Sequence, residues 1–197
     1  MKRMLLVATT VLLLGIGTAG AATLREGTVA YMRADYVEAL KIYRVLAAQG
    51  NGQAQTNLGA MYDKGQGVAK DHAEAVKWYR LAAAQGFASA QFNLGVSYDK
   101  GQGVAKDDAE AIKWYRLAAA QGIAQAQTNI GVMYAQGQGV AQDNVRAYMW
   151  FEVVAESGDA DAIKNRDIAA KKITPPQIAE AKKLARECQQ RNFKGCD

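Results

Sequence analysis

A segment of 36 residues that recurs three times constrains this chain more than any other feature of its sequence. The copies match in register over their whole length. They share the aromatic pairs Trp78-Tyr79, Trp114-Tyr115 and Trp150-Phe151, and the glycine-rich stretches 65–68, 101–104 and 137–140. Repeats with a period of about 20–50 residues are typical of solenoids, in which neighbouring units stack and share one core. We therefore expect three full, stacked units over residues 51–158.

The first half of each unit has the pattern of an amphipathic helix. In the first unit, Ala54, Leu58 and Met61 recur at helical spacing over residues 53–63. Gly65 follows, at a position where helices commonly end with a residue of positive φ, which glycine adopts without steric penalty. The other two copies predict equivalent helices.

The second half of each unit predicts a second helix that packs against the first. Asp71 is placed to cap its N-terminus, and Glu74 is placed to complete a capping box. Trp78 and Tyr79 fall on the buried stripe, opposite small residues such as Gly59, so the two helices can approach closely. The same box is expected for Asp35 with Glu38 and for Asp107 with Glu110, whereas Asp143 is followed by Arg146 and predicts a simpler cap.

Both ends of the array are degenerate, as terminal units of solenoids commonly are. Residues 23–50 keep the register of the second helix without the glycine-rich loop, and residues 159–197 hold a partial repeat, a capping helix and a tail. Thr174-Pro175-Pro176-Gln177 predicts the start of that helix, which runs to about residue 189. The fold class expected is all-α: an α-solenoid of stacked antiparallel helix pairs in a right-handed superhelix.

The first 22 residues have the layout of a secretory signal peptide. Lys2 and Arg3 precede an apolar run from Met4 to Ile16, and small residues follow it. This run is shorter than the ~20 residues that a membrane-spanning helix needs. We therefore expect cleavage after Ala21 or Ala22, a periplasmic or secreted protein, and no stable membrane insertion after cleavage.

The residues needed for catalysis or metal binding are scarce. The single histidine, His72, stands in a slot that the other units fill with Asp108 and Asn144, which indicates a surface position. Ser97 and Lys100 form an S-x-x-K motif, but Met61 and Met133 take the serine slot, so the motif is interpreted as a repeat variant. We expect no enzyme, no cofactor and no metal site.

Nucleic acid is not an expected partner either. The formal net charge is only +5, and the tryptophan–tyrosine pairs are interpreted as core and not as base-stacking platforms. The glycine-rich stretches each follow a helix, whereas a phosphate-binding loop follows a strand. They are interpreted as turns.

If the repeated positions hold the solenoid together, the varying positions of the first helices are free to bind a partner. We expect these helices to line the concave face of a monomer. The candidate positions are Gln53, Thr56, Asn57, Ser89, Phe92, Asn93, Gln125, Thr128 and Asn129. Two alternatives stay open. Phe92 is either an extra core contact or a partner anchor, and the three asparagines either clamp a peptide backbone or bond within the protein.

The whole pattern resembles one known family. A-Q-x-x-L-G-x-x-Y, then G-x-G-V, then D-x-x-x-A-x-x-W-Y and a final A-A-x-x-G are similar to the Sel-one-like repeat family, which is related to the tetratricopeptide repeats. The resemblance implies an adaptor or scaffold that binds a protein or peptide, and for exported bacterial members a role in the envelope or in host interaction. The alternatives are a binder or hydrolase directed at the cell wall or at β-lactams, and a secreted effector.

The two cysteines relate to the same resemblance. A subset of this family carries disulfides with seven residues between the paired cysteines, which is the spacing of Cys188 and Cys196. In an oxidising compartment such a pair is expected to form one disulfide that folds residues 191–194 back onto the last helix. Two free thiols or an intermolecular pair are the alternatives.

Overall fold

The computed structural model describes residues 22–196, which contain ten α-helices and no strand. Residues 1–21, most of the expected signal peptide, lie outside the described part. The helices are α1 Leu24–Met32, α2 Tyr36–Ala48, α3 Gly52–Lys64, α4 His72–Ala84, α5 Ala88–Lys100, α6 Asp108–Ala119, α7 Ala124–Gln136, α8 Asn144–Ala155, α9 Ala160–Ala170 and α10 Pro175–Gln190. The predicted all-α solenoid is confirmed.

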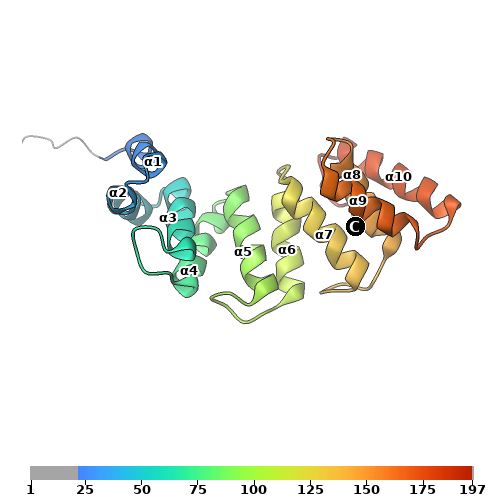
Figure 1. The fold of residues 1–197 in the computed structure, drawn as a ribbon, viewed down its shortest axis with the longest axis horizontal. Helices are drawn as coiled ribbons and strands as arrows, with labels where there is room; N and C mark the ends of the chain where they lie inside the picture. Colours follow the sequence, from blue (N-terminus) through green and yellow to red (C-terminus); the bar gives the residue numbers. More distant parts are fainter. Residues whose placement is uncertain (1–21, 197) are drawn as a thin grey trace, which may run out of the picture.

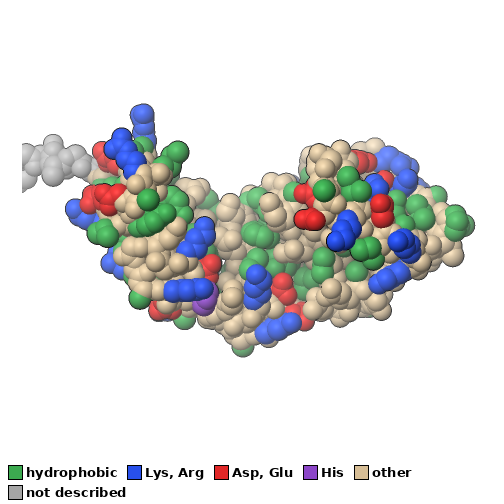
Figure 2. Space-filling view, in the orientation of Figure 1, with side chains coloured by type: hydrophobic (Ala, Val, Ile, Leu, Met, Phe, Trp, Pro, Cys, Tyr) green, Lys and Arg blue, Asp and Glu red, His purple; other side chains and the backbone are tan. Residues whose placement is uncertain are grey.

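The helices form an elongated, curved stack (Figure 1). Each helix from α1 to α9 packs mainly on the helices before and after it in the chain, and α10 turns back onto α8. The surface is hollowed along one edge, between the N-terminal pairs and the part that contains α8, α9 and α10 (Figure 2). The described residues therefore form an elongated stack in which the buried residues fall into three separate core clusters.

In each of the three full repeats, an aromatic ring of the second helix lies on a glycine of the first. A Cβ atom placed on Gly59 would lie 2.7 Å from the ring of Tyr79. The same distance separates a Cβ on Gly95 from Tyr115 and one on Gly131 from Phe151. The expected packing of small residues against large ones is therefore confirmed, and the glycine is needed for space and not for a special φ.

The degenerate first pair keeps this contact, which the sequence analysis did not anticipate. A Cβ on Gly27 would lie 2.7 Å from the ring of Tyr43. Gly27 stands 32 residues before Gly59 and not 36, because the connection between α1 and α2 is shorter than the glycine-rich loops. A search at a fixed period of 36 therefore misses it.

The helix caps are confirmed, but the capping boxes of the repeat units are not. Asp71 accepts a hydrogen bond from the backbone N–H of Glu74, as expected. The Glu74 carboxylate, however, accepts from Lys77 Nζ at 2.7 Å and from Trp78 Nε1 at 3.0 Å, so it does not return to the cap. Glu110 likewise binds Lys113, and Glu38 lies beside Lys41. Boxes do form at Thr174 with Gln177 and, unexpectedly, at Thr23 with Glu26.

The glycine-rich loops join consecutive units. Gly101 has φ +65° and ends α5 in the left-handed conformation, as the sequence predicts. Gly103, two residues on, lies so close to the backbone carbonyl of His72 that a Cβ there would collide with it. Since His72 begins α4 of the preceding unit, this loop packs one repeat against another.

The three tryptophans are not equivalent, and this corrects the expectation that all lie in the core. Trp150 is 1% exposed, whereas Trp78 and Trp114 are half-buried. The difference arises at α8, which alone among the second helices is covered by α10 and belongs to the same core cluster as Ala181 and Ala185. Nothing in the described chain covers α4 or α6 in this way.

The expected disulfide is present between Cys188 and Cys196. Cys188 is fully buried, and the N–H of Phe193 donates to the Cys188 carbonyl oxygen at 2.9 Å. Phe193 packs against the core cluster of the C-terminal repeats. The tail is thus folded back onto α10 and closes this end of the stack.

We expect Gly95→Ala to destabilise the protein, although alanine is the better helix former by about 1 kcal/mol. The new methyl group would overlap the ring of Tyr115, and overpacking of this kind lowers the free energy of unfolding by about 1–3 kcal/mol. Denaturant unfolding measures the change, with Ser89→Ala, at an exposed position of the same helix, as the control. An unchanged or raised stability would contradict the ring-on-glycine contact.

We also expect Trp150→Ala to be more damaging than Trp114→Ala. Truncating a fully buried large side chain leaves a cavity and costs about 3–5 kcal/mol, whereas a half-buried ring loses less apolar contact. Thermal unfolding of the two variants side by side gives the comparison. Equal losses would show that α10 does not set the difference between these tryptophans.

Candidate interaction surface

The nine candidate residues lie on the first helices α3, α5 and α7, but they differ in exposure. Gln53, Ser89 and Gln125 are exposed. Five others are half-buried: Asn57, Phe92, Asn93, Thr128 and Asn129. Most of the candidate side chains are therefore only partly accessible to a partner.

Thr56 is a correction to the expected surface. It is only 5% exposed, and its hydroxyl donates to the Gly52 carbonyl oxygen at 2.8 Å, one turn back in the same helix. Its hydrogen-bonding capacity is thus used inside α3. Thr128, in the equivalent slot of α7, stays half-exposed.

Two of the three asparagines bond within the protein. Asn57 Oδ1 accepts from Gln53 Nε2 at 3.0 Å, and the side chain of Asn129 is hydrogen-bonded to Tyr115. Phe92 also has an internal contact, because its ring packs at 5.9 Å from that of Tyr115. Asn57 is thus engaged within α3, whereas Phe92 and Asn129 contact Tyr115 of the neighbouring helix α6.

Three of the candidates gather around one hollow. Gln125, Thr128 and Asn129 line a cavity of about 170 Å³ between α7 and α9, together with Val154, Asp159 and Asp161. Asp159 caps α9 by accepting from the N–H of Ala162 at 2.8 Å. Among the described residues, neither of these two aspartates forms an ion pair, and both lie in the first turn or cap of α9, so the hollow is acidic.

A second hollow contains a candidate from the first unit. Asn57 lines a cavity of about 200 Å³ with Ala60 of the same helix and with Thr28, Tyr31 and Tyr43 of the first pair. A larger hollow opens between α1 and α2 at the N-terminal end, beside Ala22, where the described residues begin. That hollow contains none of the candidates.

A ladder of buried glutamines joins the repeats, and the sequence analysis did not identify its role. The side-chain amides of Gln55, Gln91 and Gln127 donate to the backbone carbonyls of Ala47, Ala83 and Ala119 in the preceding helix. Gln85 and Gln121 then donate to Gln55 and Gln91, each at 2.8 Å. The sequence signal for this ladder was the recurring A-Q pair, which places a polar glutamine at the same buried position of every full unit. A buried amide without partners is costly, so this ladder favours one register between units.

Arginine–tyrosine bonds form a second ladder that the sequence analysis missed. Arg44 donates to the Tyr62 hydroxyl at 2.8 Å, Arg80 to that of Tyr98 at 3.0 Å and Arg116 to that of Tyr134 at 3.1 Å. Each bond joins a second helix to the next first helix. Because a tyrosine hydroxyl is neutral, these contacts are hydrogen bonds and not ion pairs.

The polar pairs inside the units are structural in character. His72 Nδ1 lies 2.6 Å from Asp63 Oδ1, so the histidine, expected at a free surface slot, bridges the two helices of its unit. Burial and the nearby Asp99 carboxylate raise the pKa of the Tyr115 hydroxyl, which stays protonated and donates to Asp99. In the last unit, Phe151 takes the slot of Tyr115 and Ala135 takes the slot of Asp99, so both partners of this hydrogen bond are replaced.

The S-x-x-K motif has no exposed nucleophile. Ser97 is 6% exposed, and its hydroxyl donates to the Asn93 carbonyl oxygen at 2.9 Å. Within residues 22–196, no group of three or more His, Cys, Asp or Glu side chains is placed to hold a metal ion. None of the described helices is long and apolar enough to cross a membrane.

The fold and its ladders define an α-solenoid built from helix-pair repeats. The family model of the Sel1 repeat matches residues 20–51, 52–87, 88–123 and 124–159, and the chain therefore belongs to the Sel1 repeat family. Sel1 repeat proteins generally mediate protein–protein interactions and are typically scaffolds without enzymatic activity.

Two solved structures are similar to this chain. A Sel1 repeat protein from Oxalobacter formigenes is 35% identical with a TM-score of 0.66, and the match covers 84% of this chain and 75% of that one. The second, c5321, is described as a protective antigen of uropathogenic Escherichia coli with an SLR fold. It is 32% identical with a TM-score of 0.61, over 87% of this chain and 46% of that one. A search of curated proteins finds no match.

Proposed function

We propose that this protein is an exported scaffold that binds a protein or peptide partner on the face formed by α3, α5 and α7. The observation that carries the proposal is the hollow between α7 and α9, which three of the candidate residues line. The repeated polar side chains, by contrast, are used in ladders inside the protein. Gln125 and Thr128, which take no part in these ladders, thus remain for recognition.

The chemistry of this hollow suits a peptide segment with a basic side chain. Gln125 and Thr128 can both donate and accept hydrogen bonds, as a peptide backbone requires. Asp159 and Asp161 supply negative charge, and Val154 supplies an apolar wall. A lysine or arginine held between the two carboxylates would gain charge-assisted hydrogen bonds.

Export is supported by the N-terminal sequence and by the disulfide. Disulfides persist in oxidising compartments such as the periplasm and the extracellular space. Cys188 and Cys196 are joined, and the residues before Ala22 have the layout of a signal peptide. We propose a monomer in either compartment, with an envelope or host-interaction role.

We expect the purified protein to begin at Ala22 or Thr23, since cleavage after Ala21 or Ala22 removes the apolar run. Intact-mass spectrometry of protein from the envelope and from the medium measures this start directly. It also detects the disulfide as a loss of two hydrogens. A mass that includes residues 1–21 would contradict processing and export.

We expect a photo-crosslinking residue at Gln125 to capture the partner in living cells. The position is exposed and lies at the edge of the acidic hollow. The control carries the same crosslinker at Ala105, an exposed position in a glycine-rich loop. Adducts are identified by mass spectrometry, and Asp161→Lys in the same chain is expected to reduce their yield at least tenfold because the new lysine cancels the negative charge of Asp159 in the hollow.

Two results would contradict the proposed face. One is the same set of adducts from positions 125 and 105. The other is a yield from position 125 that Asp161→Lys leaves unchanged while circular dichroism shows both proteins folded.

A further inference from the structure

Two hollows occupy the same place in the repeat, three units apart. The first, which we call the Tyr43 hollow, is the cavity of about 200 Å³ lined by Thr28, Tyr31, Tyr43, Asn57 and Ala60. In repeat register, the equivalent residues between α7 and α9 are Val132, Ala135, Phe151, Asn165 and Ile168. All five of these line another cavity, of about 170 Å³, which we call the Phe151 hollow. The repeat thus places one kind of hollow near both ends of the face.

Each hollow contains an asparagine from one row. The row continues one unit beyond the three members that the sequence analysis identified, and all four are half-buried: Asn57, Asn93, Asn129 and Asn165. Asn57 Oδ1 accepts from Gln53, but its Nδ2 makes no hydrogen bond with the described residues, and neither does the side chain of Asn165. Gln136 and Lys172 also line the Phe151 hollow. Both hollows therefore offer hydrogen-bonding groups to a peptide backbone.

The space in each hollow comes from an alanine that departs from the repeat. Ala60 lines the Tyr43 hollow in the slot that later units fill with Val96 and Val132. Ala135 lines the Phe151 hollow in the slot that Asp99 fills one unit earlier. The smaller side chain leaves room at both ends of the face.

The two junctions between the hollows are polar and are bridged from inside the protein. Asp63 Oδ1 lies 2.6 Å from His72 Nδ1 at the first of them. At the second, Asp99 accepts from the Tyr115 hydroxyl at 3.2 Å. A ligand that crosses the face therefore meets an apolar recess, two polar junctions and a second apolar recess.

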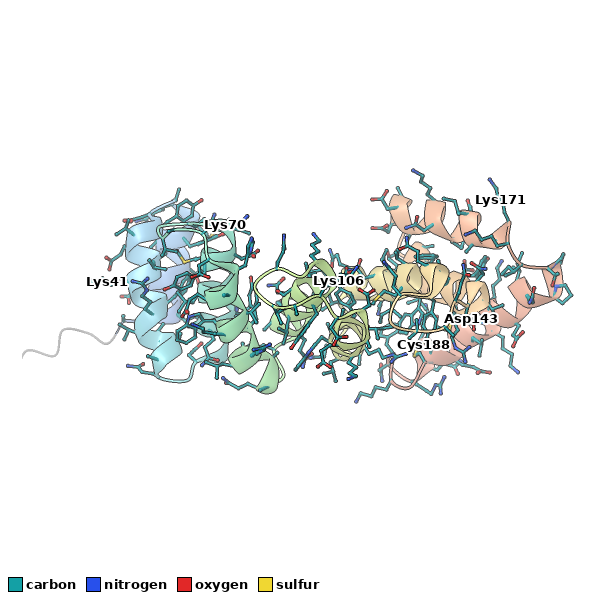
Figure 3. All side chains as sticks on the ribbon, turned by 90° about the horizontal axis from the view of Figure 1, so that it is seen from below. Lys41, Lys70, Lys106, Asp143, Lys171 and Cys188 are labelled. Atoms are coloured by element: carbon teal, nitrogen blue, oxygen red, sulfur yellow. A yellow bond between two sulfur atoms is a disulfide. The ribbon has the colours of Figure 1, made fainter. Side chains whose placement is uncertain are left out.

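The hollows lie toward opposite ends of the stack. In Figure 3 the Tyr43 hollow belongs to the helices at the Lys41 end, and the Phe151 hollow to those at the Lys171 end. If each unit adds on the order of 10 Å, the usual spacing of packed helices, three units separate the hollows by roughly 30 Å. An extended peptide covers this distance in about nine residues.

Charge sets the direction of such a peptide. The acidic hollow of Asp159 and Asp161 lies between α7 and α9, the same two helices that border the Phe151 hollow. A basic side chain of the peptide would therefore lie near the anchor at this end. The Tyr43 hollow is lined by neutral residues alone.

We propose that the partner binds as an extended peptide with two apolar anchor residues about nine positions apart, one in each hollow. The residues between the anchors are polar, and a lysine or arginine lies beside the anchor in the Phe151 hollow. A protein cavity of about 150 Å³ can hold benzene, so each hollow admits an aliphatic or aromatic side chain. The inference rests on the proposed function and specifies the partner of that face.

The test is a selection of random peptides displayed on phage against the processed, oxidised protein. Peptides of about 16 residues are long enough, when extended, to reach both hollows. Sequencing of the enriched peptides gives the motif. We expect two apolar residues at one preferred separation of about nine positions, with a basic residue beside one of them.

Two variants fill the hollows separately. Ala60→Val introduces the residue that Val96 and Val132 already provide in the later units, and Ala135→Leu fills the other hollow. Each is expected to lower the enrichment of one anchor at least tenfold and to leave the other anchor in place. Val45→Ala, at a 47% exposed position of a second helix, is the control and leaves the motif unchanged. If one filling variant lowers the melting temperature, the other carries the test.

Asp161→Lys separates this inference from the proposed function. If it removes the basic residue from the motif while both filling variants change nothing, the two-anchor inference is overturned and the proposed face stands. A single anchor, or two anchors at no preferred separation, would overturn the inference in the same way. If no peptide is enriched over selection on an unrelated protein, both are overturned.

Discussion

The structure depends on a contact that recurs in the first four helix pairs, between a glycine of the first helix and an aromatic ring of the second. A ring of tyrosine or phenylalanine occupies the space in which a Cβ atom would lie, so the two backbones come close and hold a single register. The contact recurs from Gly27 with Tyr43 to Gly131 with Phe151. The first four helix pairs therefore share the same internal packing, and the glutamine ladder joins one pair to the next.

Sequence periodicity was sufficient to predict the helices, the aspartate caps and the left-handed glycine that ends α5, because each depends on neighbours within one turn. It failed where the partner is distant. Gln121 binds Gln91 across 30 residues, and Trp150 differs from Trp114 only because α10 covers it. The capping-box prediction was wrong because nearby side chains compete for the same carboxylate. Glu74 is placed to return to the cap of α4 but binds Lys77 and Trp78 instead. At the candidate surface, Asn129 lies beside Tyr115 of α6, a contact that no spacing rule encodes.

The glutamine ladder, the arginine–tyrosine ladder and the ring-on-glycine contacts engage most of the repeated polar and aromatic groups inside the protein. What remains outside differs between the two sets of helices. The first helices meet a hollow with Asp159 and Asp161, whereas the second helices expose the aliphatic side chains of Val45, Leu81 and Leu117.

The central claim is that the repeated residues serve the fold and the varying residues serve binding. A mutational scan with two readouts, resistance of the folded protein to proteolysis and yield of crosslinked partner, tests it most directly. The account predicts that substitutions at Gly95, Tyr115 and Gln91 lower both readouts, and that those at Gln125, Thr128 and Asp161 lower only the partner yield. Face substitutions that leave the yield intact, or that lower it only together with stability, would contradict the claim.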